Sequence, residues 1–293
     1  MNRPKDRYLP AYSSKNNKGP AMVNKATRRE AVSLFTRLTE YGRMSGHICR
    51  LASISALIAG LGLVHDAYGD TSEAPGSRGN RPEPMVFDLV DPLGAPKGKL
   101  EVNTLLDYSP RSGQVEWSPE VEYSFAKGHS IELELPLENT TLNEYKVSLQ
   151  GTFGHLAKGR MIHGWQAIGR RKIEEKVYAA ELLYLNDYRF SNQWSTMNMV
   201  GARHTALGKS GDIIILMNNS LFYSYSESFS LGVELNTEIG KHDWRYRLTP
   251  QIQYAFGGGA GKGASIQLGG GPSQLNDTNK TEWLLTSRVI YDF

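Results

Sequence analysis

Charged residues recur at every second position in several segments. This spacing could bring many charges together on one surface, where they could bind or repel a solute. In "SIELELPL" (130–137) glutamates alternate with isoleucine and leucine, and in "WRYRLTPQIQYAF" (244–256) arginines alternate with aromatic residues. Alternate side chains of an extended chain point to opposite faces, so each segment would gather its charges on one face. The candidate residues for such a polar face are Glu101, Asp107, Glu120, Glu122, Glu132, Glu134, Lys146, Arg245, Arg247 and Arg288.

The same residues offer little for metal or covalent chemistry. The seven histidines do not have the spacing of a metal site, and no two of them share one strand face. No Ser and His lie in the motif context of an outer-membrane phospholipase or deacylase. We therefore expect no catalytic residues, no metal site, no cofactor and no nucleic-acid partner.

The elements that position these charges are predicted to be β-strands. Alternation over ten or more residues is the strand signal, whereas a helix repeats with a period of 3.6. "RRKIEEKVYAAELLYL" (170–185) could form a helix, but from Val177 onward it alternates, which favours a strand. Twelve segments are predicted: 99–109, 114–126, 129–138, 142–155, 160–171, 176–187, 193–203, 211–223, 227–238, 243–256, 262–270 and 281–293. The fifth and the eleventh alternate least clearly.

Strand length and aromatic placement favour a transmembrane antiparallel β-barrel over a soluble sandwich, which also alternates. Several segments exceed the five or six residues typical of globular strands and reach the nine to eleven that a tilted membrane strand needs. Aromatic residues lie near strand ends on the apolar side, where membrane interfaces place them. The fold class expected is thus all-β, a barrel of about 12 strands over residues 99–293.

In such a barrel the distribution of charge has two interpretations. The acidic candidates lie on the first three strands, and the basic ones on the fourth, tenth and last. They could create a transverse field that orients dipolar solutes, or they could neutralise one another and fill a narrow bore; the second is favoured because inward side chains occupy much of a small barrel. Since the last strand of a closed barrel lies beside the first, Arg288 is expected to face Glu101 or Asp107.

The first 69 residues differ from the rest of the chain. They carry 11 Lys and Arg against 4 Asp and Glu, whereas residues 70–293 carry 22 against 26. Arg50 precedes the apolar run 51–64, and small residues precede a cleavage point after Gly69, which is the layout of a secretory signal peptide. A buried N-terminal helix is the alternative. The basic lead is either a cytosolic extension from Met1 or lies upstream of a true start at Met44.

Residues 70–98 are rich in proline, glycine and charge. This composition predicts a flexible periplasmic leader with one short ordered patch near 85–90. The sequence leaves open whether the leader folds into the barrel and plugs it.

The sequence finishes on "TEWLLTSRVIYDF", which alternates to its last residue. Because an open edge in lipid leaves backbone groups unpaired, we expect this strand to pair with the first. The pattern resembles the C-terminal signature of bacterial outer-membrane proteins, which implies recognition by the barrel assembly machinery. The residues that match it are Trp283, Leu285, Val289, Tyr291 and Phe293.

A narrower resemblance rests on "EYSFAKGHSIELELPL" (122–137) and "LNDYRFSNQWS" (185–195). These segments resemble the small outer-membrane barrels grouped with the transporter of the meta pathway of phenol degradation, over roughly residues 85–293. The resemblance implies a channel in the bacterial outer membrane for passive passage of small, often hydrophobic or aromatic, organic solutes. The alternatives are a barrel enzyme acting on lipids and a secreted soluble β-sandwich or binding barrel.

Overall fold

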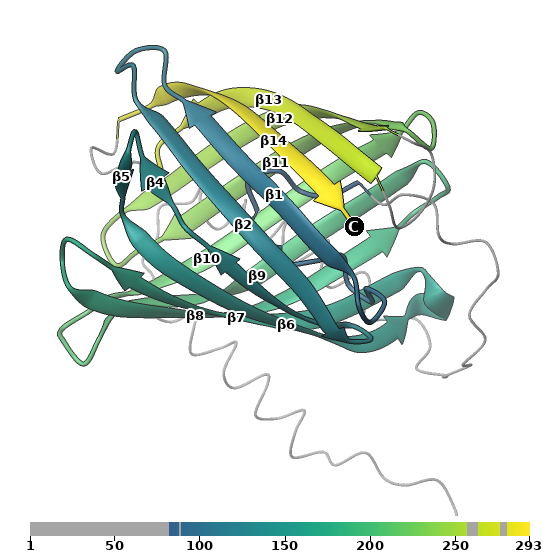
Figure 1. The fold of residues 1–293 in the computed structure, drawn as a ribbon, viewed down its shortest axis with the longest axis horizontal. Coiled ribbons are helices and arrows are strands. Elements are labelled where there is room, and N and C mark those ends of the chain that lie inside the picture. Colours follow the sequence, from purple (N-terminus) through teal and green to yellow (C-terminus); the bar gives the residue numbers. More distant parts are fainter. Residues whose placement is uncertain (1–81, 88, 257–262, 276–279) are drawn as a thin grey trace, which may run out of the picture. The chain divides into compact units, whose positions relative to one another are not determined.

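The computed structural model describes residues 82–87, 89–256, 263–275 and 280–293, and this part of the chain folds into one closed antiparallel β-barrel (Figure 1). Twelve strands form the wall, and β4 with β5 makes a short hairpin attached to β2. The strands are β1 Leu100–Tyr108, β2 Val115–Ala126, β3 His129–Glu134, β4 Leu137–Glu138, β5 Thr141–Leu142, β6 Glu144–Leu156, β7 Met161–Lys172, β8 Val177–Arg189, β9 Trp194–Leu207, β10 Ile213–Ser224, β11 Phe229–Ile239, β12 Trp244–Phe256, β13 Gly263–Ser273 and β14 Glu282–Asp292.

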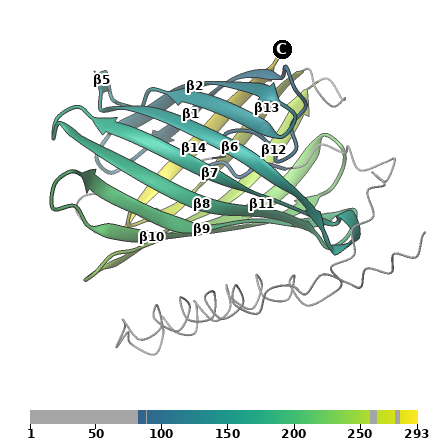
Figure 2. The same ribbon diagram turned by 90° about the horizontal axis from the view of Figure 1, so that it is seen from below.

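The barrel closes between β1 and β14, as the alternation of the last segment predicted. Val102 faces Tyr291 and Leu106 faces Ser287 in this antiparallel register, and the Phe293 amide donates to the Leu100 carbonyl at 3.0 Å. β1 also pairs with β2, so both edges of β1 are occupied (Figures 1 and 2). Neighbours in the wall are otherwise consecutive in sequence, apart from the β4–β5 hairpin.

The two faces of the wall have opposite chemistry. Apolar side chains such as Val121, Leu133 and Leu285 are about half exposed on the outside. Acidic, basic and amide side chains at the alternate positions are buried inside. A soluble sandwich would bury its apolar faces against each other, so this arrangement contradicts the sandwich alternative and is that of a barrel surrounded by lipid.

Aromatic rings lie at both ends of the outer surface. The ring centroids of Tyr291 and Phe293 are 4.8 Å apart, and those of Tyr254 and Phe256 are 4.9 Å apart. Trp117, Trp244 and Trp283 are exposed on the same surface. This is the placement that interfacial girdles have, with the apolar part of each ring toward lipid and the polar part toward water.

The twelve predicted segments correspond one to one with the twelve wall strands. The third segment ends earlier than expected, because Pro136 follows β3 and its ring nitrogen cannot donate to the ladder. Residues 170–185 form the end of β7, a turn and the start of β8, so the strand prediction is confirmed over the helix. In the described ranges no helix is long and apolar enough to cross a membrane.

Residues 82–87 and 89–95, called the inner segment, precede β1 and lie inside the barrel. Met85, Phe87, Leu89, Val90 and Leu93 of this segment are all buried. The sequence predicts one short ordered patch near 85–90 within a flexible leader and leaves the position of the leader open; in the structure these apolar side chains pack against the inner wall. The predicted signal peptide and residues 70–81 lie outside the described residues.

Removing residues 283–293 should prevent assembly of the barrel. The deletion leaves β1 and β13 with unpaired edges, and each backbone group left unpaired in lipid costs several kcal/mol. Heat-modifiable migration on a gel, with unboiled and boiled samples compared, measures the folded membrane-inserted fraction. We expect almost none for the deletion and a reduced but clear amount for Phe293→Ala. Normal yield from the deleted chain would show that β14 does not close the wall.

Candidate functional site

The interior of the barrel contains nine of the ten charged candidates as buried side chains. They come from the inward positions of β1, β2, β3, β6, β12 and β14 and are Glu101, Asp107, Glu120, Glu122, Glu132, Glu134, Lys146, Arg247 and Arg288. Arg245 is half-buried near the start of β12. Because burying an unpaired charge is costly, the arrangement depends on how these groups are compensated.

Asp107 and Arg247 form a bidentate ion pair inside the barrel. The two guanidinium nitrogens of Arg247 each donate to one Asp107 oxygen at 2.7 Å. The Thr286 hydroxyl donates to Asp107 at 2.5 Å and accepts from Arg247 at 2.6 Å. β1, β14 and β12 supply these three residues, so the pair connects strands across the seam where the barrel closes.

Arg288 lies among the acidic residues of β1 and β2, but its partners differ from those expected. Its guanidinium donates to Glu120 at 3.3 Å and to the Asn103 amide oxygen at 3.2 Å. It also lies 3.7 Å from Glu122. Arg288 is opposite Leu105 in the β1–β14 register, so its long side chain crosses β1 and reaches β2. Asp107 is instead paired with Arg247.

Two lysines compensate the remaining acids near β1 and β3. Lys146 bonds Glu134 and lies 3.3 Å from Glu132. Lys99, just before β1, lies 2.9 Å from Asp91 of the inner segment and 2.6 Å from Glu101. Burial disfavours the charged form of Lys99, but the fields of Glu101 and Asp91 outweigh it and raise the pKa of the ammonium group.

Sequence reasoning missed a belt of alternating charges on the inner wall, of which only Arg245 was among the candidates. The belt runs over β6, β7, β8, β9, β11 and β12 through Glu144, Arg170, Glu181, Arg203, Glu238 and Arg245. Its N–O distances are 2.6–2.8 Å. Two of the pairs are directly opposite in register, Glu181 with Arg203 and Glu238 with Arg245, so a strand alignment of the twelve segments would have brought them together.

Sequence reasoning also missed an apolar region of the inner wall on β7 to β10. It consists of Ile162, Ile168, Leu183, Leu185, Met197, Met199, Ile214, Leu216 and Phe222. Phe87, Leu89 and Leu93 of the inner segment pack in the same cluster. These four strands therefore carry apolar residues on both faces, which explains why the alternation of the segment that forms β7 is unclear.

The wall is shaped to accept the inner segment. A Cβ at Gly269 would lie 2.5 Å from the Met85 side chain, and one at Gly164 would lie 2.8 Å from Leu93. Polar wall residues bind the backbone of the segment: Glu234 accepts the amides of Met85 at 2.9 Å and Val86 at 3.1 Å, Thr152 accepts that of Gly94 at 2.9 Å, and Gln150 donates to the Asp91 carbonyl at 2.5 Å. The segment is thus held by backbone hydrogen bonds as well as by apolar contact.

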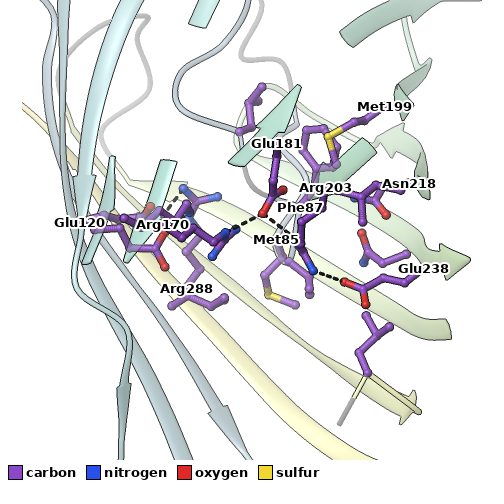
Figure 3. Close-up of a pocket in the computed structure, with 18 residues that line it drawn as sticks. Met85, Phe87, Glu120, Arg170, Glu181, Met199, Arg203, Asn218, Glu238 and Arg288 are labelled. Atoms are coloured by element: carbon purple, nitrogen blue, oxygen red, sulfur yellow. Dashed lines mark hydrogen bonds and ion pairs between the residues drawn. The ribbon is translucent and has the colours of Figure 1, made fainter. Parts of the chain in front are cut away.

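A cavity of about 230 Å³ remains between the inner segment and the wall (Figure 3). Its lining combines apolar groups, among them Phe87 and Met199, with ions of both signs. Glu181 lies between Arg170 and Arg203, and Arg203 reaches Glu238 (Figure 3). The cavity therefore presents an apolar side and a charged side to whatever enters it.

The residues of the predicted assembly signature lie on the outer surface of β14 and just beyond it. Trp283, Leu285, Val289, Tyr291 and Phe293 are all exposed. Their alternate neighbours Thr286, Arg288 and Ile290 are buried inside. The last strand thus has a lipid-facing side of apolar and aromatic residues and an inner side that carries Arg288.

The fold of this chain is similar to that of solved outer-membrane porins and channels. No family model and no curated protein matches this chain. The NanC porin aligns with 66% of this chain and 100% of its own, with a TM-score of 0.54 and 11% sequence identity. The KdgM porin covers 66% of this chain and 99% of its own (TM-score 0.48, 10% identity), and an outer membrane channel from Pseudomonas putida F1 covers 71% and 100% (0.49, 12%). The fold is that of a porin-like outer-membrane barrel.

Arg247→Ala should destabilise the folded barrel by about 3–5 kcal/mol, because it leaves the Asp107 carboxylate buried without its counter-charge. Lys172→Ala is the control: its pair with Glu175 is exposed, and surface pairs contribute about 0–1 kcal/mol. Denaturant unfolding of the detergent-solubilised protein measures both. The double variant Asp107→Leu/Arg247→Met should recover most of the loss. Similar small losses for both single variants would refute a structural role for the pair.

Proposed function

We propose that this protein is an outer-membrane channel through which small organic solutes move down their gradient. The observation that carries the proposal is the closed wall with an apolar outer surface and a charged interior. Such a wall is stable only with lipid outside and water or polar groups inside. The porin-like fold supports the same function, and no covalent step or cofactor is needed.

The chemistry of the interior suggests which solutes would pass. One side of the lumen, on β7 to β10, is apolar, and three of these strands also carry members of the charged belt, Arg170, Glu181 and Arg203. A solute with an apolar or aromatic body and a polar or charged group matches both surfaces. This agrees with the solutes implied by the resemblance to the phenol meta-pathway transporters, whose hairpin motif corresponds to β2 and β3 here.

We infer that the inner segment, as it lies against the wall, holds this channel in a closed state. Its cavity of about 230 Å³ is smaller than the ~300–1,000 Å³ typical of small-molecule pockets, and the inner segment forms part of the lining. Passage therefore requires the inner segment to shift away from the wall. The backbone hydrogen bonds to Glu234, Thr152 and Gln150 are the contacts that oppose this shift.

Export and assembly complete the proposal. The signal peptide would be removed after Gly69, so that the mature chain begins at Asp70, and the exposed residues of β14 would be read by the barrel assembly machinery. N-terminal sequencing of membrane-extracted protein tests the first part. A mature start upstream of residue 44 would contradict it.

Glu234→Ala should increase conductance. The substitution leaves the amides of Met85 and Val86 without their acceptor, which weakens the attachment of the inner segment by roughly 1–3 kcal/mol. Since 1.4 kcal/mol is a factor of ten in an equilibrium, the open fraction should rise by about five- to a hundredfold. Single-channel recording in planar bilayers measures it.

Glu227→Ala, in an exposed turn between β10 and β11, is the matched control and should conduct like the wild type. Unchanged conductance of Glu234→Ala would show that the inner segment does not limit passage. Complete absence of conductance and of liposome swelling in every variant would overturn the channel itself. Phospholipase and deacylase assays on the same preparations test the alternative of a lipid-directed enzyme.

A further inference from the structure

Three glutamates lie side by side on the inner wall where β1, β2 and β3 meet. Glu122 on β2 is directly opposite Glu101 on β1 and directly opposite Glu132 on β3. Like charges in directly opposed positions repel each other, and inside the barrel there is little water to screen them. Glu120 is two residues before Glu122 on the same face, so a fourth carboxylate borders the row.

The cations near this row are arranged mostly around its edges. Lys99 lies beside Glu101, and Lys146 lies beside Glu132 and Glu134. Arg288 donates to Glu120 at 3.3 Å and lies 3.7 Å from Glu122. Within the described residues, three cations therefore lie beside five carboxylates of this wall, which are those of Glu101, Glu120, Glu122, Glu132 and Glu134.

Glu122, in the middle of the row, is only partly satisfied. One of its oxygens, Oε1, accepts from the Asn103 amide at 2.5 Å. The other oxygen, Oε2, is buried and accepts no hydrogen bond, and the residue as a whole is only 1% exposed. Leaving a buried carboxylate oxygen without a partner is unfavourable, so this oxygen is available for a ligand that supplies positive charge.

The geometry around Glu122 suits a hard divalent cation. One carboxylate oxygen from each of Glu120, Glu122 and Glu132 lies within 4.8 Å of the others. Carboxylate oxygens are the preferred ligands of Ca²⁺, which accepts flexible geometry and can bind one or both oxygens of each carboxylate. A second trio, Asp91, Glu101 and Glu122, is equally compact, but Lys99 lies 2.9 Å from Asp91 and 2.6 Å from Glu101. The cations at the first trio are more distant: Arg288 lies 3.3 Å from Glu120, and Lys146 lies 3.3 Å from Glu132.

We propose that Glu120, Glu122 and Glu132 form a divalent-cation site on the inner wall, with Ca²⁺ as the best-suited ion. A bound ion would neutralise the repulsion along β1, β2 and β3 and would give Glu122 Oε2 its missing partner. It would also set the charge of the lumen on the side opposite the apolar wall of β7 to β10. This proposal does not depend on the proposed channel function.

Equilibrium dialysis of the folded, detergent-solubilised full chain with radioactive ⁴⁵Ca²⁺ tests the proposal. The wild type should bind one ion per chain, and Glu122→Gln should weaken binding by about tenfold or more, since affinity follows the number of charged ligands. Glu120→Gln, at the edge of the site, provides a second variant. Heat-modifiable migration establishes that each variant is folded before binding is measured.

Glu116→Gln is the matched control, because Glu116 lies on β2 in the same inward series, outside the trio and exposed. It should bind Ca²⁺ like the wild type. No binding by the wild type overturns the site, as does equal binding by wild type and folded Glu122→Gln. If stability responds to pH but not to Ca²⁺, the carboxylates share protons instead and the proposal is wrong. Because conductance is not measured, these outcomes are separate from those that test the channel.

Discussion

The need to pair every backbone amide and carbonyl in lipid is the constraint on which the rest of this structure depends. Twelve strands satisfy it only if the last pairs with the first, and β14 does so along the whole of β1. Once the wall is closed, alternate side chains must point either to lipid or to the interior. The exposed apolar face and the buried charged face follow from that closure.

Closure also creates an enclosed space that has to be filled or solvated. Buried carboxylates are compensated by arginine and lysine from other strands, as with Asp107 and Arg247, rather than by neighbours in sequence. The inner segment fills much of the remaining volume and brings its own apolar side chains. A narrow barrel can therefore be both well packed and rich in charge. Its ions are paired with one another, and its apolar wall residues pack against the inner segment.

This arrangement connects stability with function. The same contacts that hold the inner segment, its apolar packing on β7 to β10 and its hydrogen bonds to Glu234 and Thr152, are those that a passing solute would replace. The charged belt beside it fixes the relative positions of six strands. In the proposed channel, the wall would stay folded while the inner segment moves.

The sequence by itself determined the fold class, the number of wall strands and the face of most charged residues, since a period of two assigns a side chain to a face without any knowledge of its neighbours. Glu132, Glu134, Arg247 and Arg288 could be recognised in this way. The folded barrel was needed to establish which charges meet, that Arg288 reaches Glu120 rather than Asp107, and that residues 82–87 and 89–95 lie inside. It also placed Ile168 inward on β7, where apolar residues on both faces had obscured the alternation. The physical reason is that partners depend on strand register and on contacts across the closed barrel, which join residues more than a hundred positions apart.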